Sequence, residues 1–478
     1  MNTMFRNLLL ALAVLFTFTA CGGGGGGSGT VASGGISGTG SSSTGTITSF
    51  GSVYVNGVKF DTTSSSVSID GASGTESQLK VGMVVKVKGT IYSDGTTGSA
   101  TSIKFSSDVE GPISAKDLVL NTLTVLGQTV IVDGTTVFEG ATGLSDPTLV
   151  VGNNVEVSGF RNASGIVASR IEKKTAGNIQ VKGTISNLNT GATTFTLGAL
   201  TVNYGSVLNP PVLKNGLLVE VKASTAATPL IATKIEIEDA AETEGNEVEV
   251  EGYISDFTNA ASEFKVAGQV VRIASNAKFE NGAAGDLNNG AKIEAEGILT
   301  SGVLVASKVS VKQSTAIKVN IKVEAPVEAI DANSITVLGQ KFTFNNLTQM
   351  EDKTVAQLKL NIGNIFGIIV AGEHVAVRGY KNSAGNLVAT RIERNADTKV
   401  VLQGPLEAAT SPTLKILGLT VTTSSTSPVT KFEAADGSAS DAATFFGTAI
   451  GTIVKVEGTK TGTGSAAVIT ATEVEIEN

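Results

Sequence analysis

The stretch VGMVVKVKG, residues 81–89, decides the fold because its pattern occurs six times along the chain. The other copies are VGNNVEVSG (151–159), NGLLVEVKA (215–223), NGAKIEAEG (289–297), AGEHVAVRG (371–379) and IGTIVKVEG (450–458). Each copy places a glycine three residues before a β-branched residue, after which apolar and polar residues alternate. Alternation with a period of two is typical of a strand with one buried and one exposed face. We therefore expect a glycine turn that leads into an amphipathic core strand in every copy.

A second motif, Ala-(Ser/Thr)-x-(Ile/Val), follows each core strand and indicates a closing strand. Its copies are residues 100–103, 168–171, 232–235, 306–309, 389–392 and 471–474. Each unit also begins with a short segment such as GTIT (45–48), followed by a hairpin that is clearest at Asn56-Gly57, a strong type I′ turn signal. Opening, hairpin, core and closing strands make about five strands per unit. Five strands with one apolar face can close into a small barrel without exposed edges.

The repeats predict an all-β fold of six tandem, small, five-stranded barrels of the OB or SH3-like kind in an elongated array. The segment between hairpin and core strand varies most, and in the fifth unit residues 355–360 are expected to form a short helix. The predicted units are residues 45–108, 109–178, 179–245, 246–318, 319–399 and 400–478.

These units resemble the domain of unknown function 5666, a small β-barrel module found in tandem in bacterial exported lipoproteins. The resemblance rests on the repeated motifs and covers residues 45–478. It implies the architecture and an envelope location. The family carries no assigned catalytic residues, so the resemblance implies no site.

The N-terminus has the layout of a secretory signal over residues 1–20, with Arg6 before an apolar run that is too short to span a bilayer. It resembles a bacterial lipoprotein signal, although Phe18 stands where that signal has Leu. The resemblance implies lipidation of Cys21 and a Gly/Ser-rich tether over residues 21–44, which would behave as a flexible coil. Gly22, rather than Asp, after the cysteine implies the outer membrane; both the periplasmic and the outer face stay open.

Composition restricts the classes of partner. Only 16% of residues are charged, and the formal net charge of −8 repels nucleic acid and anionic lipid. Cys21 is the one cysteine, so no intramolecular disulfide can form. The expected partners are the membrane, through the lipid anchor, and envelope proteins or glycans. No nucleic acid partner is expected.

The sequence contains no recognisable catalytic, metal or cofactor site. His374 is the sole histidine and has no second His or Cys to complete a metal set or a nucleophilic triad. Acidic residues are dense between residues 236 and 251. Such a run is compatible with Ca²⁺ binding or with a solvated strand face followed by an acidic linker. The second interpretation is preferred because no calcium-loop spacing orders the carboxylates.

Aromatic side chains offer the remaining candidates for recognition. Phe138, Phe279 and Phe432, each followed by Glu, recur at one position of the repeat and are expected to fill barrel cores. The pairs Phe160-Arg161 and Tyr380-Lys381, which directly follow core strands, are the candidate partner-binding residues. The alternative is that each pair is a hairpin tip packed on its own barrel.

The sequence is compatible with functions of three classes. A non-catalytic, lipid-anchored envelope protein that acts as a spacer or presents surface for protein interactions is preferred, because the repeats carry no repeated polar constellation. An envelope binding module for glycan or peptide ligands, using the barrel loops, is the alternative. A hydrolytic enzyme would need residues that the sequence does not offer.

Overall fold

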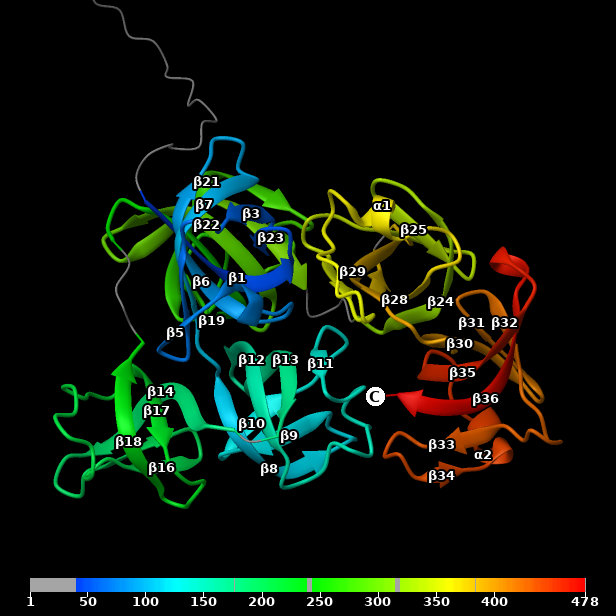
Figure 1. Ribbon diagram of the computed structural model, residues 1–478, viewed down its shortest axis with the longest axis horizontal. Helices are drawn as coiled ribbons and strands as arrows, with labels where there is room; N and C mark the ends of the chain where they lie inside the picture. The colour runs from blue at the N-terminus through cyan, green and yellow to red at the C-terminus, as the bar shows by residue number, and fades with distance from the viewer. Residues whose placement is uncertain (1–39, 176, 239–242, 314–318, 383, 478) are drawn as a thin grey trace, which may run out of the picture. The chain divides into compact units, whose positions relative to one another are not determined.

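The computed structural model describes residues 40–175, 177–238, 243–313, 319–382 and 384–477 (Figure 1). The predicted signal, Cys21 and residues 21–39 of the predicted tether lie outside these residues. The prediction that the tether extends to residue 44 is wrong, because residues 41–44 form the start of the first strand and pair with residues 247–250. Strands dominate the described chain, and the expected all-β class is confirmed. No described helix is long and apolar enough to cross a membrane.

The first unit shows the plan of all six. Its strands are β1 (Ser41–Ser49), β2 (Val53–Val55), β3 (Val58–Asp61), β6 (Val84–Ile91) and β7 (Thr97–Phe105). They pair in the order β1-β2-β3-β7-β6 and back to β1, so the sheet closes. Only β3 and β7 run parallel. This is the arrangement of a five-stranded Greek-key barrel of the OB type.

The other units repeat this ladder. The second unit has β8 (Val109–Asp117), β9 (Thr122–Val125), β10 (Gln128–Ile131), β12 (Asn154–Asn162) and β13 (Gly165–Lys174). The third has β14 (Ile179–Asn189), β15 (Thr194–Leu197), β16 (Leu200–Asn203), β17 (Leu218–Ala223) and β18 (Leu230–Ile237). The fourth has β19 (Glu247–Ser255), β20 (Phe264–Val266), β21 (Gln269–Glu280), β22 (Lys292–Thr300) and β23 (Val303–Gln313).

The last two units follow the same order. The fifth has β24 (Ile321–Ile330), β25 (Ser334–Val337), β26 (Gln340–Thr343), β28 (His374–Lys381) and β29 (Leu387–Arg394). The sixth has β30 (Val400–Thr410), β31 (Thr413–Ile416), β32 (Leu419–Thr422), β35 (Ile453–Thr461) and β36 (Val468–Glu477).

A further short strand lies between the hairpin and the core strand in five units and pairs parallel with the closing strand. It is β4 (Ser66–Ile69), β11 (Val137–Glu139), the end of β21, β27 (Gln349–Asp352) or β33 (Lys431–Glu433). We call it the added strand. Two units extend it into a hairpin, with β5 (Ala72–Gly74) and β34 (Ala439–Ser440). The third unit forms no strand over the corresponding residues 204–215.

The predicted helix over residues 355–360 is wrong. The Asp352 carboxylate accepts hydrogen bonds from the backbone N–H groups of Thr354 and Leu358, at 3.0 and 2.8 Å, which hold this stretch as a loop. Val355 is fully exposed, so no apolar helix face would be buried there. The fifth unit instead has α1 (Ile365–Ile368), with Ile365 buried, and the sixth has α2 (Ala442–Phe446).

The barrels are joined in pairs through their opening strands. β8 pairs with β14, and β24 with β30, both antiparallel, whereas β1 pairs parallel with β19. Units two and three share one hydrophobic cluster, and so do units five and six. The first unit therefore pairs with the fourth, although the second follows it in sequence (Figure 1). At the junction of the first and fourth units, polar groups of the opening strand β1 contact the fourth unit, as Ser43 does with Glu249.

Candidate functional site

The candidate residues Phe160 and Arg161 lie at the end of β12, where Phe160 is buried and Arg161 is partly buried. Phe160 is 5% exposed and packs against Val167 and Tyr253. The Lys292 ammonium lies 4.4 Å from the centre of the Phe160 ring, in a cation–π contact. Both Tyr253 and Lys292 belong to the fourth unit, so this aromatic side chain serves contact within the chain.

Arg161 also makes internal contacts. Its guanidinium donates to Gln128 Oε1 at 3.1 Å and to the backbone carbonyl of Lys182. Burial lowers the pKa of Arg161. Because Lys182 belongs to β14, Arg161 links the second barrel to the third.

Tyr380 and Lys381, at the end of β28, lie differently. Lys381 is exposed, whereas Tyr380 is half-buried and lines a polar cavity of about 140 Å³ with Thr46, Asn56 and Lys292 among others. Cavities that enclose small molecules are usually ~300–1,000 Å³. The cavity is therefore too small to enclose a ligand of that kind. Lys381 keeps the exposure that partner contact requires.

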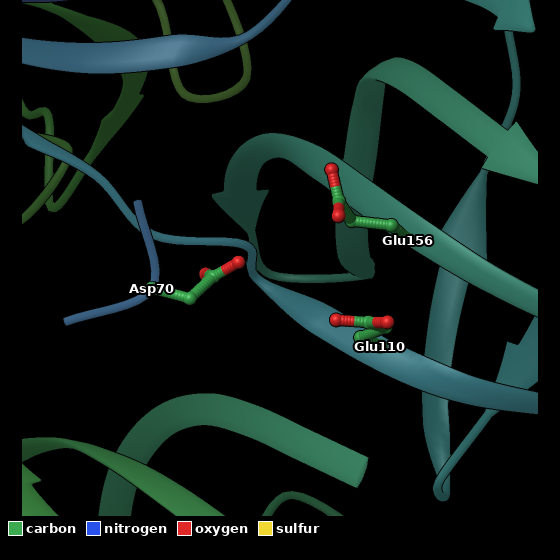
Figure 2. Close-up of side chains that lie close together, drawn as sticks. All are labelled: Asp70, Glu110 and Glu156. Atoms are coloured by element: carbon green, nitrogen blue, oxygen red, sulfur yellow. The ribbon is translucent and has the colours of Figure 1, made fainter. Parts of the chain in front are cut away.

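A cluster of three carboxylates lies where the first three units meet. Asp70 follows β4, Glu110 lies on β8, and Glu156 lies on β12; one carboxylate oxygen from each lies within 4.8 Å of the others (Figure 2). Glu110 and Glu156 are only 1% and 7% exposed. Figure 2 shows Glu110 and Glu156 on neighbouring strands of one barrel, with Asp70 on a separate turn facing them.

This carboxylate cluster has its own internal partners. Asp70 Oδ1 accepts from Gln180 Nε2 at 2.7 Å and from the Ser107 N–H at 2.9 Å. The Lys174 ammonium lies 3.2 Å from Glu156. Burial raises the pKa of Glu156 to about 7 and also raises the pKa of Glu110. A cation could use these oxygens only in competition with Lys174 and a proton.

A second cluster lies where the first and fourth units join. Glu249 on β19 and Glu294 and Glu296 on β22 again lie within 4.8 Å by one carboxylate oxygen each. Ser43 Oγ of β1 donates to Glu249 at 2.5 Å, and Lys312 lies 2.5 Å from Glu294. Burial, and then the charge of Glu294, raises the pKa of Glu249 well above its usual range. The fold therefore favours the protonated form of Glu249 more than water does.

The second cluster corrects the interpretation of the acidic run as a solvated face. Glu249 and Glu251 are 1% and 5% exposed, because β1 covers the edge of β19. The Thr46 backbone N–H donates to Glu251 at 2.8 Å, and Lys292 lies 2.6 Å from the same side chain. Sequence reasoning missed these burials because alternation identifies the polar face of a strand without showing what covers it. The available sequence signal for these buried carboxylates was that glutamates occur on both VEVEG (248–252) and KIEAEG (292–297).

The remaining expectations concern single side chains. The His374 ring nitrogens lie 2.6 Å from Asn395 Oδ1 and 2.8 Å from the Lys399 carbonyl oxygen, so this side chain contacts the connection between the fifth and sixth units. Phe432 is 9% exposed, and Phe138 and Phe279 are partly buried against their barrel cores. The predicted role of these phenylalanines in the cores is confirmed.

The ladders define a class, that of all-β proteins built from tandem OB-like barrels. A family model described as Domain of unknown function (DUF5666) matches residues 44–104, 110–172, 182–236, 251–310, 324–393 and 403–475. The chain belongs to this family.

Four chains among the solved structures match; one of them, "drosophila Unr CSD456", has 14% sequence identity, and the match covers 45% of this chain and 96% of that one. Its TM-score of 0.11 is too low to support an argument about fold or function. No curated protein matched the sequence.

Proposed function

We propose that this protein is a non-catalytic, lipid-anchored component of the cell envelope that acts as a spacer and presents its barrels for protein interactions. The proposal rests on a difference between two kinds of position in the repeat: the structural positions recur, and the polar positions do not. The glycines and core residues recur in the units, whereas the polar position of Glu156 is Lys86, Glu220, Glu294, Ala376 or Lys455 elsewhere. A catalytic constellation copied with the scaffold would have kept its polar residues.

The anchor is proposed at Cys21. Acyl chains there would contribute ~0.8 kcal/mol for each buried CH₂ group, and two or more chains together would hold the protein on a membrane durably. The part of the predicted tether that precedes β1, residues 21–40, would separate the barrels from the bilayer. Outer-membrane placement, on either face, follows from the signal-like N-terminus and Gly22.

The proposal is tested by producing the full chain in a bacterium with two membranes and labelling it with a fatty acid. Wild-type protein should take up the label and fractionate with the outer membrane, whereas Cys21→Ser should be unlabelled and released. Labelled C21S, or unlabelled wild type in the soluble fraction, would remove the anchor from the account. Turnover of a substrate by purified protein would contradict the non-catalytic part.

A binding module for glycan or peptide is the second candidate, favoured by a hollow in the sixth unit. The hollow measures about 740 Å³, and its lining combines apolar side chains such as Phe432 with hydroxyl and acidic ones such as Ser424 and Asp441. That volume is within the range of ligand pockets. Glycan-array binding that Asp441→Ala abolishes would support it, and an empty array would count against it.

A further inference from the structure

The third unit lacks the added strand that the other five units possess. In the second unit, Val137, Phe138 and Glu139 of β11 pair parallel with Arg170, Ile171 and Glu172 of β13. The third unit has only residues 204–215 between its hairpin and Gly216, the turn glycine before its core strand, and none of them forms a strand. Among the described residues, no strand pairs with this edge of β18 over residues 234–237. The edge therefore offers unpaired backbone groups.

The missing strand leaves the core uncovered at the end of β18. Ile237 pairs with Val219, which is 0% exposed, and thus lies on the core-facing side of its strand. It is nevertheless 42% exposed, whereas Phe105 at the equivalent place in the first unit is 0% exposed. Leu208 and Val212, in the segment that replaces the added strand, are each 90% exposed.

The missing strand also leaves a cation without its usual partner. Arg170 lies 3.5 Å from Glu139 of its added strand, and Arg391 lies 3.2 Å from Glu351 of its own. Lys234 is the equivalent residue of β18. Its side chain is 54% exposed, and its ammonium pairs with Glu236 of the same strand at 2.9 Å.

We propose that the edge of β18 over residues 234–237 binds an extended peptide of a partner protein, which adds to the barrel as a parallel strand. The peptide carries an aromatic or large aliphatic residue directly followed by an acidic one. The apolar side chain lies beside the buried Ile235 and covers the exposed Ile237, and the carboxylate pairs with Lys234. This inference rests on the proposed presenting role and specifies the chemistry of the partner.

The chain itself provides the template for this peptide. Three of the added strands read Val-Phe-Glu, Lys-Phe-Glu and Gln-Met-Glu-Asp. In each, the Phe or Met lies opposite an apolar residue of the closing strand, with a further residue pair on either side. Strand addition uses main-chain hydrogen bonds for affinity and alternate side chains for specificity. Here the specificity comes from an apolar contact with Ile237 and an ion pair with Lys234.

The test is a fluorescence anisotropy titration of the full chain with a labelled peptide VTKFEAA, the sequence of residues 429–435. We expect saturable binding with a Kd of about 10–100 μM. Lys234→Glu should weaken it about tenfold, and a peptide VTKFKAA should bind K234E better than wild type. Ile237→Asn should weaken the binding of both peptides. Lys415→Glu, an exposed charge reversal on β31, is the matched control and should bind like wild type.

Three results would overturn the inference: no saturation by 1 mM peptide, equal binding by wild type and K234E, or dimerisation of the chain that excludes the peptide. The last would show that a second copy occupies the edge. None of these results alters the fatty-acid labelling of Cys21, so failure here is distinguishable from failure of the proposed anchor.

Discussion

Two glycines in five of the six repeat motifs are fixed by different physical constraints. The first, such as Gly372, has φ +92°, a left-handed conformation that side-chain-bearing residues rarely adopt. The second, such as Gly379, lies at a β-bulge, where an added Cβ would come within 2.1 Å of the Val388 carbonyl oxygen. Four other units have the same close approach, and the third carries Ala223 instead. The motif therefore records backbone geometry.

We expect Gly379→Ala to lower the free energy of unfolding by about 1–3 kcal/mol, because the new methyl group forces the closing strand away. Gly367→Ala in α1 is the control, since an added Cβ there meets nothing within 4 Å. It should be neutral or stabilising by up to about 1 kcal/mol. Chemical denaturation measures both variants. A neutral G379A would show that the bulge opens without cost.

Buried Glu156 predicts a pH dependence of stability. Its pKa is about 7 in the fold and 4.5 in the unfolded chain, so the folded state holds the proton more tightly. The contribution of protonated Glu156 to the free energy of unfolding is complete below pH 4.5 and is lost as pH rises through 7. At ~1.4 kcal/mol per pKa unit, the loss is on the order of 3 kcal/mol.

The measurement is the difference in unfolding free energy between wild type and Glu156→Gln at several pH values. The neutral amide should stabilise the protein relative to wild type increasingly between pH 5 and 7. Parallel pH curves for the two proteins would contradict a proton on Glu156.

At the scale of the elements, the added strand covers the end of the barrel core in the five units that contain this strand. In the sixth unit, Phe432 of β33 lies with its ring centre 5.3 Å from that of Phe445 in α2. The recurrence of Phe-Glu in the sequence predicted the buried ring. It did not predict the strand, because three residues between two loops are too short for alternation to be visible.

Phe432→Ala should cost about 3–5 kcal/mol, since it removes a buried ring and leaves a cavity. Val429→Ala, three residues earlier and 60% exposed, should change stability by less than about 0.5 kcal/mol. Thermal or chemical unfolding compares them directly. Equal effects would mean that β33 contributes little to the core.

At the scale of the whole molecule, barrels are joined by their opening strands. Local motifs predicted each barrel well, because turn glycines and alternation act over a few residues. They could not predict that β1 joins β19, since pairing between distant strands leaves no local signal. The burial of Phe160 and Glu249 was missed for the same reason, because residues of another unit cover each of them.

Joining the barrels in pairs predicts that single units are incomplete. In the sixth unit, Leu402 of β30 pairs with Val323 of β24, and the two units share a hydrophobic cluster. A fragment of residues 319–478 should be a monomer that unfolds cooperatively. A fragment of residues 400–478 should self-associate or have a lower Tm, as sedimentation and calorimetry would reveal. Equal Tm values for two monomeric fragments would contradict the shared core.

The most direct test of the open edge in the third unit is hydrogen exchange of the six closing strands in the intact protein. Over residues 234–237 of β18, the alternate backbone N–H groups that face away from β17 should exchange at least about tenfold faster than their equivalents in residues 102–105 and 391–394, because those strands are paired on both sides. Adding the VTKFEAA peptide should slow them. Equal protection of all six closing strands without peptide would show that the third barrel has no open edge.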